Sequence, residues 1–291
     1  MEAKPACIAI TGGGGFLGNP TVAALSQSDS IIVAASRTSG KRNGSMENFF
    51  PVRVDITDRS SWKNLFIGNS PTRLIHLAWD YLDAFEDPRH YLELLPAHLA
   101  FIEWCVRNGI SDVTIAGTCY EYGLVDGELF EEMPAKPVLA YAIAKDALRR
   151  SLEHFSRSAP FALKWARIFF VRGDGEAEKG IFKRIRDAGD NGESTIPFSW
   201  GEQLRDYLPR REVGRFLAHV CLQNDVVGIV NCCSGRPVSM RRMVEDYAKQ
   251  WPKLKLDFGK TAYRSFEPMA FWGNRARMDE ILSVRIPAAM A

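Results

Sequence analysis

Tyr141 and Lys145 are the residues whose types and spacing most directly suggest chemistry. Residues at i and i+4 of a helix lie on one face, one turn apart. A free tyrosine has a pKa of about 10, so it is a poor acid–base group at neutral pH unless its phenolate is stabilised. The ammonium group of Lys145 supplies that stabilisation and can also bind ribose hydroxyls. The pair predicts proton transfer by a tyrosine, and the pair alone leaves open that both are ordinary residues of a helix surface.

Thr118 adds a hydroxyl group at the end of an apolar run, Val113–Gly117, that precedes this helix in the chain. The run has the composition of a buried strand. Polar and aromatic residues follow it through Tyr122, and open α/β sheets bind their ligands at the carboxyl ends of central strands. We therefore predict that the catalytic residues are Thr118, Tyr141 and Lys145.

A glycine-rich corner near the start of the chain is the element that would position a cofactor beside these residues. Ile8–Ile10 has the pattern of a strand buried on both faces, and an apolar helical pattern follows the glycines. A strand that ends in glycines and opens a helix presents backbone N–H groups and the positive end of a helix dipole. This arrangement predicts a phosphate site, although a glycine run can also be only a flexible turn. The spacing is G-x-x-G-x-x-G, at Gly12, Gly15 and Gly18.

Arg37 follows the second apolar run, Ile31–Ser36, where a dinucleotide-binding fold meets the adenosine ribose. An acidic residue there binds the ribose 2′-hydroxyl, whereas an arginine accommodates a 2′-phosphate. Lys41 and Arg42 continue the basic segment, and no carboxylate precedes Glu47. A solvated basic loop would explain the segment by itself, but together with the glycine corner Arg37 favours NADP over NAD.

Two later strand ends complete the predicted cofactor site. Asp55 ends the alternating segment Pro51–Asp55, where its carboxylate could meet the adenine amino group or only belong to a loop or helix cap. The fourth strand, Arg73–Ala78, opens a loop beside the expected nicotinamide ribose. His76 lies inside that apolar strand, so we interpret it as a structural residue and not as a catalyst. We expect the cofactor to contact Gly12, Gly15, Phe16, Leu17, Gly18, Arg37, Asp55, Ile56, Ala78, Trp79, Tyr141 and Lys145.

The composition narrows the class of protein. The chain has 291 residues, of which 46% are hydrophobic and 25% are charged, as in an ordinary globular enzyme. A net charge of +2 gives no reason to expect nucleic acid, and no apolar run reaches membrane-spanning length. The N-terminus lacks a signal-peptide pattern, and the six cysteines have no zinc-site spacing. We therefore expect a cytoplasmic protein with reduced thiols and no metal site.

Short motifs typical of a single protein family occur over most of the chain. Only the last forty or so residues resemble that family weakly. The motifs are TGGGGFLG at Thr11–Gly18, Thr118, YAIAK at Tyr141–Lys145, ARIFFVRGDG at Ala166–Gly175, Arg205-Asp206-Tyr207 and GIVNCCSG at Gly228–Gly235. Together they resemble an extended short-chain dehydrogenase/reductase. The resemblance implies an α/β fold, a Rossmann-type doubly wound parallel sheet with a smaller C-terminal α/β substrate lobe. We expect residues 1–168 to form the NADP-binding domain, 209–235 to return to it and 169–291 to form the substrate lobe.

The resemblance also implies a reaction, because the extended branch mostly acts on nucleotide-activated sugars. Its dehydratases carry an Asp-Glu pair directly after the catalytic threonine, where this chain has Cys119 and Tyr120. Its epimerases recycle a tightly held NAD, whereas a reductase consumes NADPH, which Arg37 fits. The segment GTCYEYG resembles that of sugar 4-ketoreductases. The expected activity is NADPH-dependent reduction of the C4 keto group of a nucleoside-diphosphate 4-keto-6-deoxyhexose, in deoxysugar biosynthesis.

The residues that contact the substrate are harder to assign from the family resemblance, because this chain departs from the family pattern in the substrate-binding segment. The asparagine that helps hold the diphosphate is Phe170 here, and Arg172 begins a segment that replaces Tyr-Gly-Pro-Gly. Arg172, Lys183 and Arg205 are the candidate diphosphate partners, since arginine suits phosphate oxygens. We expect the substrate to contact Trp79, Thr118, Cys119, Tyr120, Tyr141, Phe170 and Arg205.

Members of the family form homodimers through two helices, which correspond here to segments near His90–Asn108 and Ala140–Ser156. We therefore expect a homodimer that binds a nucleotide sugar and neither nucleic acid nor a membrane. Three other functions remain open. They are a nucleotide-sugar 4-epimerase with tightly bound NAD, an NADPH-dependent reductase of a carbonyl that is not a nucleotide sugar, and a non-catalytic NADP-sensing protein.

Overall fold

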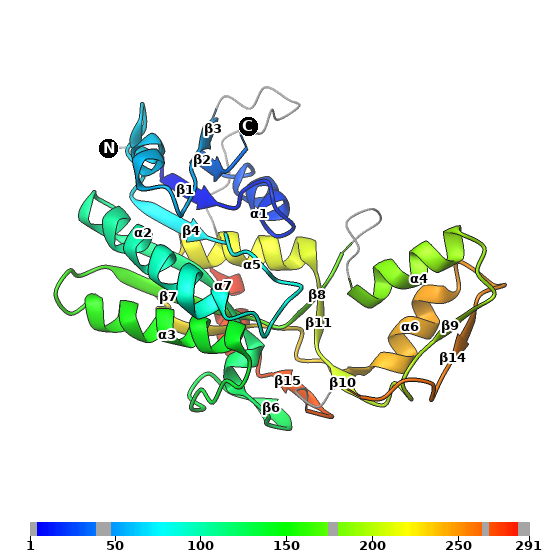
Figure 1. Ribbon diagram of the computed structural model, residues 1–291. Coiled ribbons are helices and arrows are strands. Elements are labelled where there is room, and N and C mark those ends of the chain that lie inside the picture. The colour runs from blue at the N-terminus through cyan, green and yellow to red at the C-terminus, as the bar shows by residue number, and fades with distance from the viewer. Residues whose placement is uncertain (1–4, 39–47, 174–179, 264–267, 285–291) are drawn as a thin grey trace.

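Seven parallel strands form the sheet at the centre of the larger part of the molecule (Figure 1). The structure is a computed structural model that describes residues 5–38, 48–173, 180–263 and 268–284. In space the strands run in the order β12-β7-β5-β4-β1-β2-β3, and all neighbouring pairs are parallel. Their bounds are β1 (Cys7–Thr11), β2 (Ile31–Ser36), β3 (Phe49–Arg53), β4 (Arg73–His76), β5 (Asp112–Thr118), β7 (Ala162–Ile168) and β12 (Gly228–Cys232). This doubly wound order confirms the predicted fold class.

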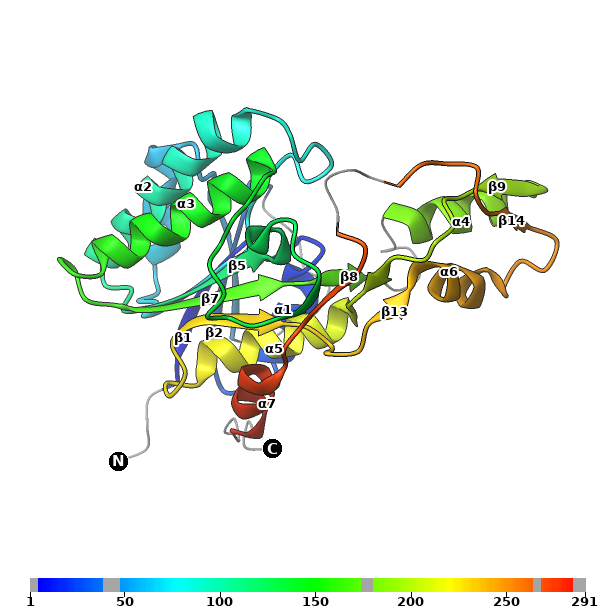
Figure 2. The same cartoon turned by 90° about the horizontal axis from the view of Figure 1, so that it is seen from below.

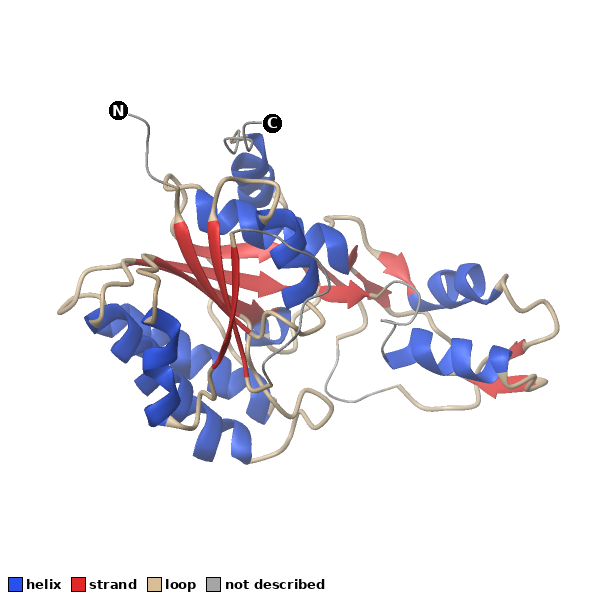
Figure 3. Cartoon of the chain, turned by 90° about the horizontal axis from the view of Figure 1, so that it is seen from above, coloured by secondary structure: helices blue, strands red, loops and turns tan. Residues whose placement is uncertain are grey.

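Helices cover both faces of the sheet, which is why its strands are apolar on both sides (Figure 3). One face packs against α1 (Gly18–Leu25), α5 (Arg210–Leu222) and α7 (Ala276–Ser283). The other face packs against the 3-10 helix η1 (Arg59–Phe66), α2 (Leu95–Arg107) and α3 (Ala140–Phe155). Two apolar cores therefore hold the sheet between its helix layers.

A smaller lobe extends from the end of the sheet where its strands terminate (Figure 2). It contains α4 (Gly180–Asp190), β9 (Thr195–Pro197), α6 (Met240–Ala248) and β14 (Lys255–Asp257). Ile185 of α4 and Val244 of α6 are buried together in its own apolar core. Short strand pairs join the two parts: β8 (Phe170–Arg172) with β11 (Tyr207–Pro209), β10 (Leu204–Arg205) with β13 (Val238–Ser239), and β6 (Gly127–Leu129) with β15 (Phe271–Gly273).

The helix expected over His90–Asn108 differs from the prediction in its first turn. His90–Leu94 form a π-helical turn, η2, and α2 begins only at Leu95. Pro96 lies in the first turn of α2 and has no N–H to donate to the preceding turn, so the regular α-helical bonding starts after it. The helix ends at Arg107, and Gly109, two residues later, has a φ of 110° that suits glycine.

Three parts of the sequence prediction fall outside the described residues. These are the basic residues Lys41 and Arg42 and the segment Asp174-Gly175. Within the described residues, no helix is long and apolar enough to cross a membrane.

Candidate active site

The three predicted catalytic residues lie together at the carboxyl end of the central strand β5. Thr118 is the last residue of β5, and Tyr141 is the second residue of α3, where its backbone N–H donates to the carbonyl of Phe85. The side chain of Thr118 lies close enough to that of Tyr141 to lower the pKa of the phenol. Lys145 follows one helical turn later and is 2% exposed. The strand end and the helix start thus bring a hydroxyl, a phenol and an ammonium group to one place.

The acid–base state of Tyr141 differs from the sequence-based expectation. Burial raises the pKa of Tyr141 above its ordinary value, the negative charge of Glu121 adds to the rise, and the hydrogen bond with Thr118 only partly opposes it. Nζ of Lys145 donates to the carbonyl of Ala116 at 2.9 Å. Burial lowers the pKa of Lys145 itself to about 7, against the opposing effect of Glu121. Tyr141 is therefore a protonated phenol at neutral pH.

Trp79 forms one wall of this group. Its ring centroid lies 3.9 Å from Nζ of Lys145, and its indole N–H donates to Nδ1 of His90 at 3.1 Å. The ring stacks on His98, whose Nδ1 lies 2.7 Å from Nε2 of His76. His76 is completely buried inside β4, which agrees with its interpretation as a structural residue. Trp79 is thus held rigidly against Lys145 by a layer of buried histidines.

Glu121 is the residue of the site that sequence reasoning missed. It is completely buried at the end of η3 (Cys119–Tyr122), where its carboxylate accepts from the backbone N–H of Thr118 at 2.8 Å. It also accepts from the indole N–H of Trp165 and from Nε of Arg167 at 2.9 Å. Gly117 leaves room for this cluster, because a Cβ there would lie 2.7 Å from the carboxylate. The spacing Thr-x-x-Glu is the signature of a capping box, which could have predicted the contact.

The glycine corner has the shape of a phosphate site. Gly12 has a φ of +71°, and its carbonyl accepts from the N–H of Gly15 at 2.9 Å. A Cβ at Gly18 would lie 2.0 Å from that carbonyl, so only glycine fits there. Leu17 stands at the N-cap of α1 without a side-chain cap, and the first turn carries no acidic residue. The positive end of the helix is therefore available to an anion.

The neighbouring residues predicted for the cofactor lie around this corner. The backbone N–H of Ala78 donates to Oγ1 of Thr11, directly beside Gly12. Phe16 lies with its ring 5.8 Å from the guanidinium of Arg210. Ile56 is 9% exposed and packs into the core, so only its edge can reach a cofactor.

Arg37 and Asp55 lie at the side of the corner where β2 and β3 end. Arg37 forms a two-point ion pair with Asp80, with N···O distances of 3.0 and 2.9 Å. Asp55 accepts hydrogen bonds from the N–H and the hydroxyl of Thr57. Burial alone would raise the pKa of Asp55, but the hydrogen bonds from Thr57 and the charge of Arg37 lower it. Asp55 therefore acts as a loop residue here, and its carboxylate stays near Arg37.

Four of the predicted substrate residues belong to a continuous row of aromatic rings. Tyr141 contacts Phe85 at 5.6 Å between ring centroids, and Phe85 contacts Tyr120 at 5.4 Å. Tyr120 contacts Phe170 at 6.0 Å, and Phe170 contacts Tyr207 at 5.2 Å. Trp79 joins the row through Tyr141. The row leads from the catalytic group toward the lobe.

The remaining predicted substrate residues are less accessible. Cys119 is 4% exposed and packs into a small apolar cluster. Arg205 is 2% exposed, its Nη1 donates to the carbonyl of Leu204, and its guanidinium lies 5.0 and 5.6 Å from the rings of Phe271 and Phe170. The structure thus brings Arg205 to the aromatic row but leaves little of it exposed to a ligand.

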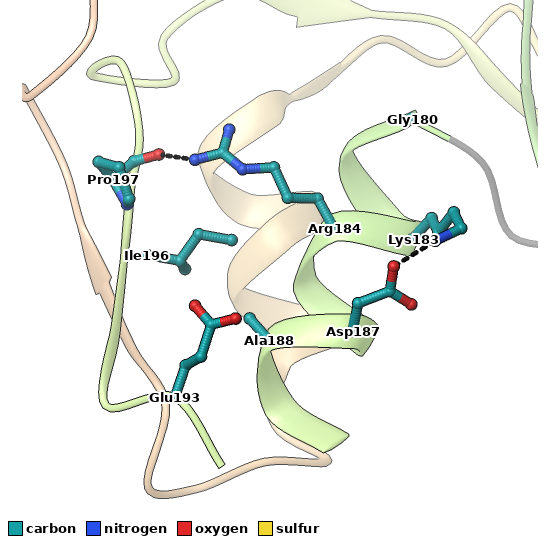
Figure 4. A pocket seen from close by; sticks show the side chains of 8 residues that line it. All are labelled: Gly180, Lys183, Arg184, Asp187, Ala188, Glu193, Ile196 and Pro197. Atoms are coloured by element: carbon teal, nitrogen blue, oxygen red, sulfur yellow. Dashed lines mark hydrogen bonds and ion pairs between the residues drawn. The ribbon is translucent and has the colours of Figure 1, made fainter. Parts of the chain in front are cut away.

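Lys183 faces a different cavity, of about 380 Å³, in the lobe (Figure 4). It pairs with Asp187 of the same helix, and Arg184 donates to the carbonyl of Pro197 across the cavity. Charged side chains of both signs line this cavity, which also includes Glu193. Within the described part of the chain, no cluster of His, Cys, Asp and Glu residues could hold a metal ion.

Comparisons with known proteins agree with this geometry. The family model described as "NAD dependent epimerase/dehydratase family" matches residues 8–233. A dTDP-6-deoxy-L-talose 4-dehydrogenase (NAD(+)) from Aggregatibacter actinomycetemcomitans is 29% identical over 268 residues, which cover 91% of this chain and 98% of that protein.

Solved structures share the fold at lower identity. A UDP-N-acetylglucosamine 4-epimerase from Methanobrevibacter ruminantium M1, in complex with UDP-N-acetylmuramic acid, has a TM-score of 0.82 and 23% identity, covering 97% of this chain and 93% of that one. MoeE5 in complex with UDP-glucuronic acid and NAD has a TM-score of 0.79 and 22% identity, with coverage of 98% and 95%.

Proposed function

The chain belongs to the NAD dependent epimerase/dehydratase family, and from that membership we propose that it reduces the C4 keto group of a nucleoside-diphosphate 4-keto-6-deoxyhexose with NADPH. The family match confirms the resemblance seen in the motifs, and a nicotinamide cofactor follows from it. The observation that carries the proposed reaction is the meeting of Thr118, at the end of β5, with Tyr141 and Lys145, one turn apart on α3. No carboxylate stands at positions 119 and 120, and that of Glu121 is occupied in the core.

The glycine corner fits a dinucleotide. The missing Cβ of Gly18 and the uncapped start of α1 provide the close approach and the positive field that a diphosphate requires. When bound, the nicotinamide supplies the hydride that the carbonyl carbon accepts. Arg37, at the end of β2, supports the 2′-phosphorylated form of the cofactor.

The geometry supports a separate role for each of the three proposed catalytic residues. Tyr141 donates its phenolic proton to the carbonyl oxygen of the sugar, and its raised pKa keeps that proton in place at neutral pH. Thr118 donates a hydrogen bond to the same oxygen. Lys145, held over Trp79, is positioned to bind the ribose hydroxyls of the cofactor.

The sugar class is supported by a relative. An enzyme named as a 4-dehydrogenase of dTDP-6-deoxy-L-talose, run in reverse, reduces a C4 ketone on a nucleotide-activated 6-deoxyhexose. The row of rings from Tyr141 to Tyr207 offers apolar surface for a sugar or a base.

Replacing Tyr141 with phenylalanine tests the proposed reaction. We expect Tyr141→Phe to lower turnover about 10²- to 10⁴-fold, because the proton donor is lost, and to leave the dissociation constant for NADPH nearly unchanged. Turnover is measured as NADPH oxidation with dTDP-, GDP-, CDP- and UDP-4-keto-6-deoxy sugars. Tyr91→Phe, at a partly exposed tyrosine of η2, is the matched control. Unchanged turnover in Tyr141→Phe would exclude the assignment.

A nucleotide-sugar 4-epimerase with tightly bound NAD is the second candidate. Two observations favour it: Arg37 is already paired with Asp80, and MoeE5 is a fold neighbour solved with NAD. NAD that stays bound through purification, together with conversion of a sugar without net NADPH consumption, distinguishes this reaction from reduction.

We also propose that the chain forms a homodimer through α2 and α3 and acts in the cytoplasm. Leu92 and Ile143, at the starts of these two helical segments, are large apolar residues exposed by 66% and 43%. Covering them would remove apolar surface from water. All six cysteines are free thiols, as a reducing compartment requires. The mass in solution, from sedimentation equilibrium, tests the dimer.

A further inference from the structure

Asp80 accepts hydrogen bonds from both terminal nitrogens of Arg37. Its Oδ2 accepts from Nη1 at 3.0 Å and its Oδ1 from Nη2 at 2.9 Å. The two residues are 43 positions apart in the chain. Arg37 follows β2 and Asp80 lies four residues after β4, and β1 lies between these strands in the sheet. The pair therefore crosses the carboxyl end of β1, next to the glycine corner.

This position matters for cofactor choice, because the adenosine ribose binds where β2 ends. A 2′-phosphate carries about −1.5 to −2 charges and gains most from a cation whose charge is not already compensated. Asp80 compensates the charge of Arg37, and the carboxylate of Asp55 also lies within reach of its field. A 2′-hydroxyl needs only an acceptor, which a carboxylate provides.

The exposure of the Arg37–Asp80 pair determines how much its loss can change cofactor binding. The side chains of Arg37 and Asp80 are 63% and 42% exposed. Ion pairs as exposed as this are weak, and removing one changes an equilibrium constant by a factor of about 1.5 to 5. The pair can therefore be altered without threatening the fold, and a 2′-phosphate can compete with Asp80 for Arg37.

We propose that Asp80 is a specificity-determining residue that limits the preference of this site for NADP over NAD by holding Arg37 in an ion pair. The proposal rests on the proposed function, in which Arg37 meets the adenosine ribose. It means that the wild-type protein accepts both cofactors with modest discrimination, and that removing the carboxylate of Asp80 releases Arg37 for the 2′-phosphate.

Binding of NADP⁺ and of NAD⁺ to the substrate-free protein, measured by isothermal titration calorimetry, tests the proposal. In Asp80→Asn we expect the dissociation constant for NADP⁺ to fall about two- to fivefold, while that for NAD⁺ stays the same or rises. Asp29→Asn is the matched control, because this exposed carboxylate precedes β2 at the opposite end of the strand. It removes the same charge and should change neither constant.

Arg37→Ala and the double variant Arg37→Ala/Asp80→Asn test whether Arg37 is the cation through which Asp80 affects NADP⁺ binding. Arg37→Ala should weaken NADP⁺ binding, and adding Asp80→Asn to it should bring no gain for NADP⁺. An unchanged or weakened affinity of Asp80→Asn for NADP⁺ overturns the inference, as does a gain that persists without Arg37.

Because no sugar is present, failure of this inference is separate from failure of the proposed reaction. If both dinucleotides bind and Asp80→Asn changes nothing, only the role of Asp80 is wrong. If neither dinucleotide binds the wild-type protein, the cofactor assignment and this inference both fail.

Discussion

Two arginine–carboxylate pairs with the same shortest N···O distance differ widely in burial in this protein. In the first, Nε of Arg167 lies 2.9 Å from Oε2 of Glu121, and the side chains are 1% and 0% exposed. In the second, Nη2 of Arg37 lies 2.9 Å from Oδ1 of Asp80, and the side chains are 63% and 42% exposed. Equal distances therefore do not mean equal energies, because water screens the second pair and not the first.

The buried pair of Glu121 and Arg167 supports the residues that we propose as catalytic. Glu121 accepts from the backbone N–H of Thr118 and thereby orients a residue that lies beside Tyr141. The indole N–H of Trp165 and the guanidinium of Arg167 satisfy the rest of the carboxylate. Removing Glu121 would leave the guanidinium of Arg167 buried without its counter-charge. The exposed pair lies where we propose that the adenosine ribose binds, and it can be altered with little loss of stability. The proposed catalytic residues therefore rest on a buried ion pair, and the proposed cofactor preference on an exposed one.

Replacing Glu121 with glutamine gives the largest expected effect. In Glu121→Gln the guanidinium of Arg167 loses its counter-charge in a buried place, and we expect the free energy of unfolding to fall by about 3–5 kcal/mol. Urea denaturation followed by circular dichroism measures it. Glu132→Gln is the control, because Glu132 is exposed and lies in the same connection between β5 and α3. It should change the free energy of unfolding by less than about 0.5 kcal/mol.

A pH profile separates the electrostatic role of Glu121 from its structural one. Because the charge of Glu121 contributes to the raised pKa of Tyr141, its loss should lower the pKa that governs the alkaline side of the rate profile. The double variant Glu121→Gln/Arg167→Met removes the unpaired charge and restores stability for this measurement. A profile that coincides with that of the wild type would contradict the electrostatic role.

The next largest expected effect is the loss of stability at acidic pH that the buried histidines His76 and His98 cause. Burial lowers the pKa of His76 to about 3, helped by the charge of Lys145, and lowers the pKa of His98 well below its ordinary value. The unfolded chain binds protons at these histidines near pH 6.5, whereas the folded chain does not. The free energy of unfolding should therefore fall as the pH decreases from about 6.5 toward 3, by up to about 1.4 kcal/mol per pH unit for each histidine.

Urea denaturation at several pH values between these limits measures this slope. His98→Gln should make the slope shallower by up to about 1.4 kcal/mol per pH unit, because one proton fewer is bound on unfolding. His154→Gln replaces an exposed histidine of α3 and serves as the control. Equal slopes in His98→Gln and the wild type would show that His98 titrates alike in both states.

The sequence could predict part of the candidate site, including one member of the buried ion pair. Gly12, Gly18, Thr118, Tyr141 and Lys145 were predictable because strand-end, glycine and i, i+4 patterns are local. Glu121 was within reach of the same kind of argument, through the Thr-x-x-Glu capping box.

Other features depend on contacts that no local pattern encodes. Asp80 meets Arg37 only because β1 separates β2 from β4 in the folded sheet. The pKa of Tyr141 is raised and not lowered, because burial, which helical spacing does not reveal, outweighs the other effects on the phenol. The effect expected of Lys145 itself stays a prediction. Sequence patterns therefore predicted which residues the fold brings together, but not the electrostatic surroundings of those residues.

The smallest expected effect is the contribution of the Arg37–Asp80 pair to stability. A double-mutant cycle of Arg37→Ala, Asp80→Ala and the double variant should give a coupling free energy of about 0.2–1 kcal/mol in urea denaturation. The coupling should shrink at high ionic strength, because both side chains are exposed to screening ions. A coupling above about 2 kcal/mol, or one that salt leaves unchanged, would mean that the pair behaves like the buried one. In that case Asp80 would not release Arg37 to a 2′-phosphate, and cofactor preference at this site would be as fixed as the placement of Thr118.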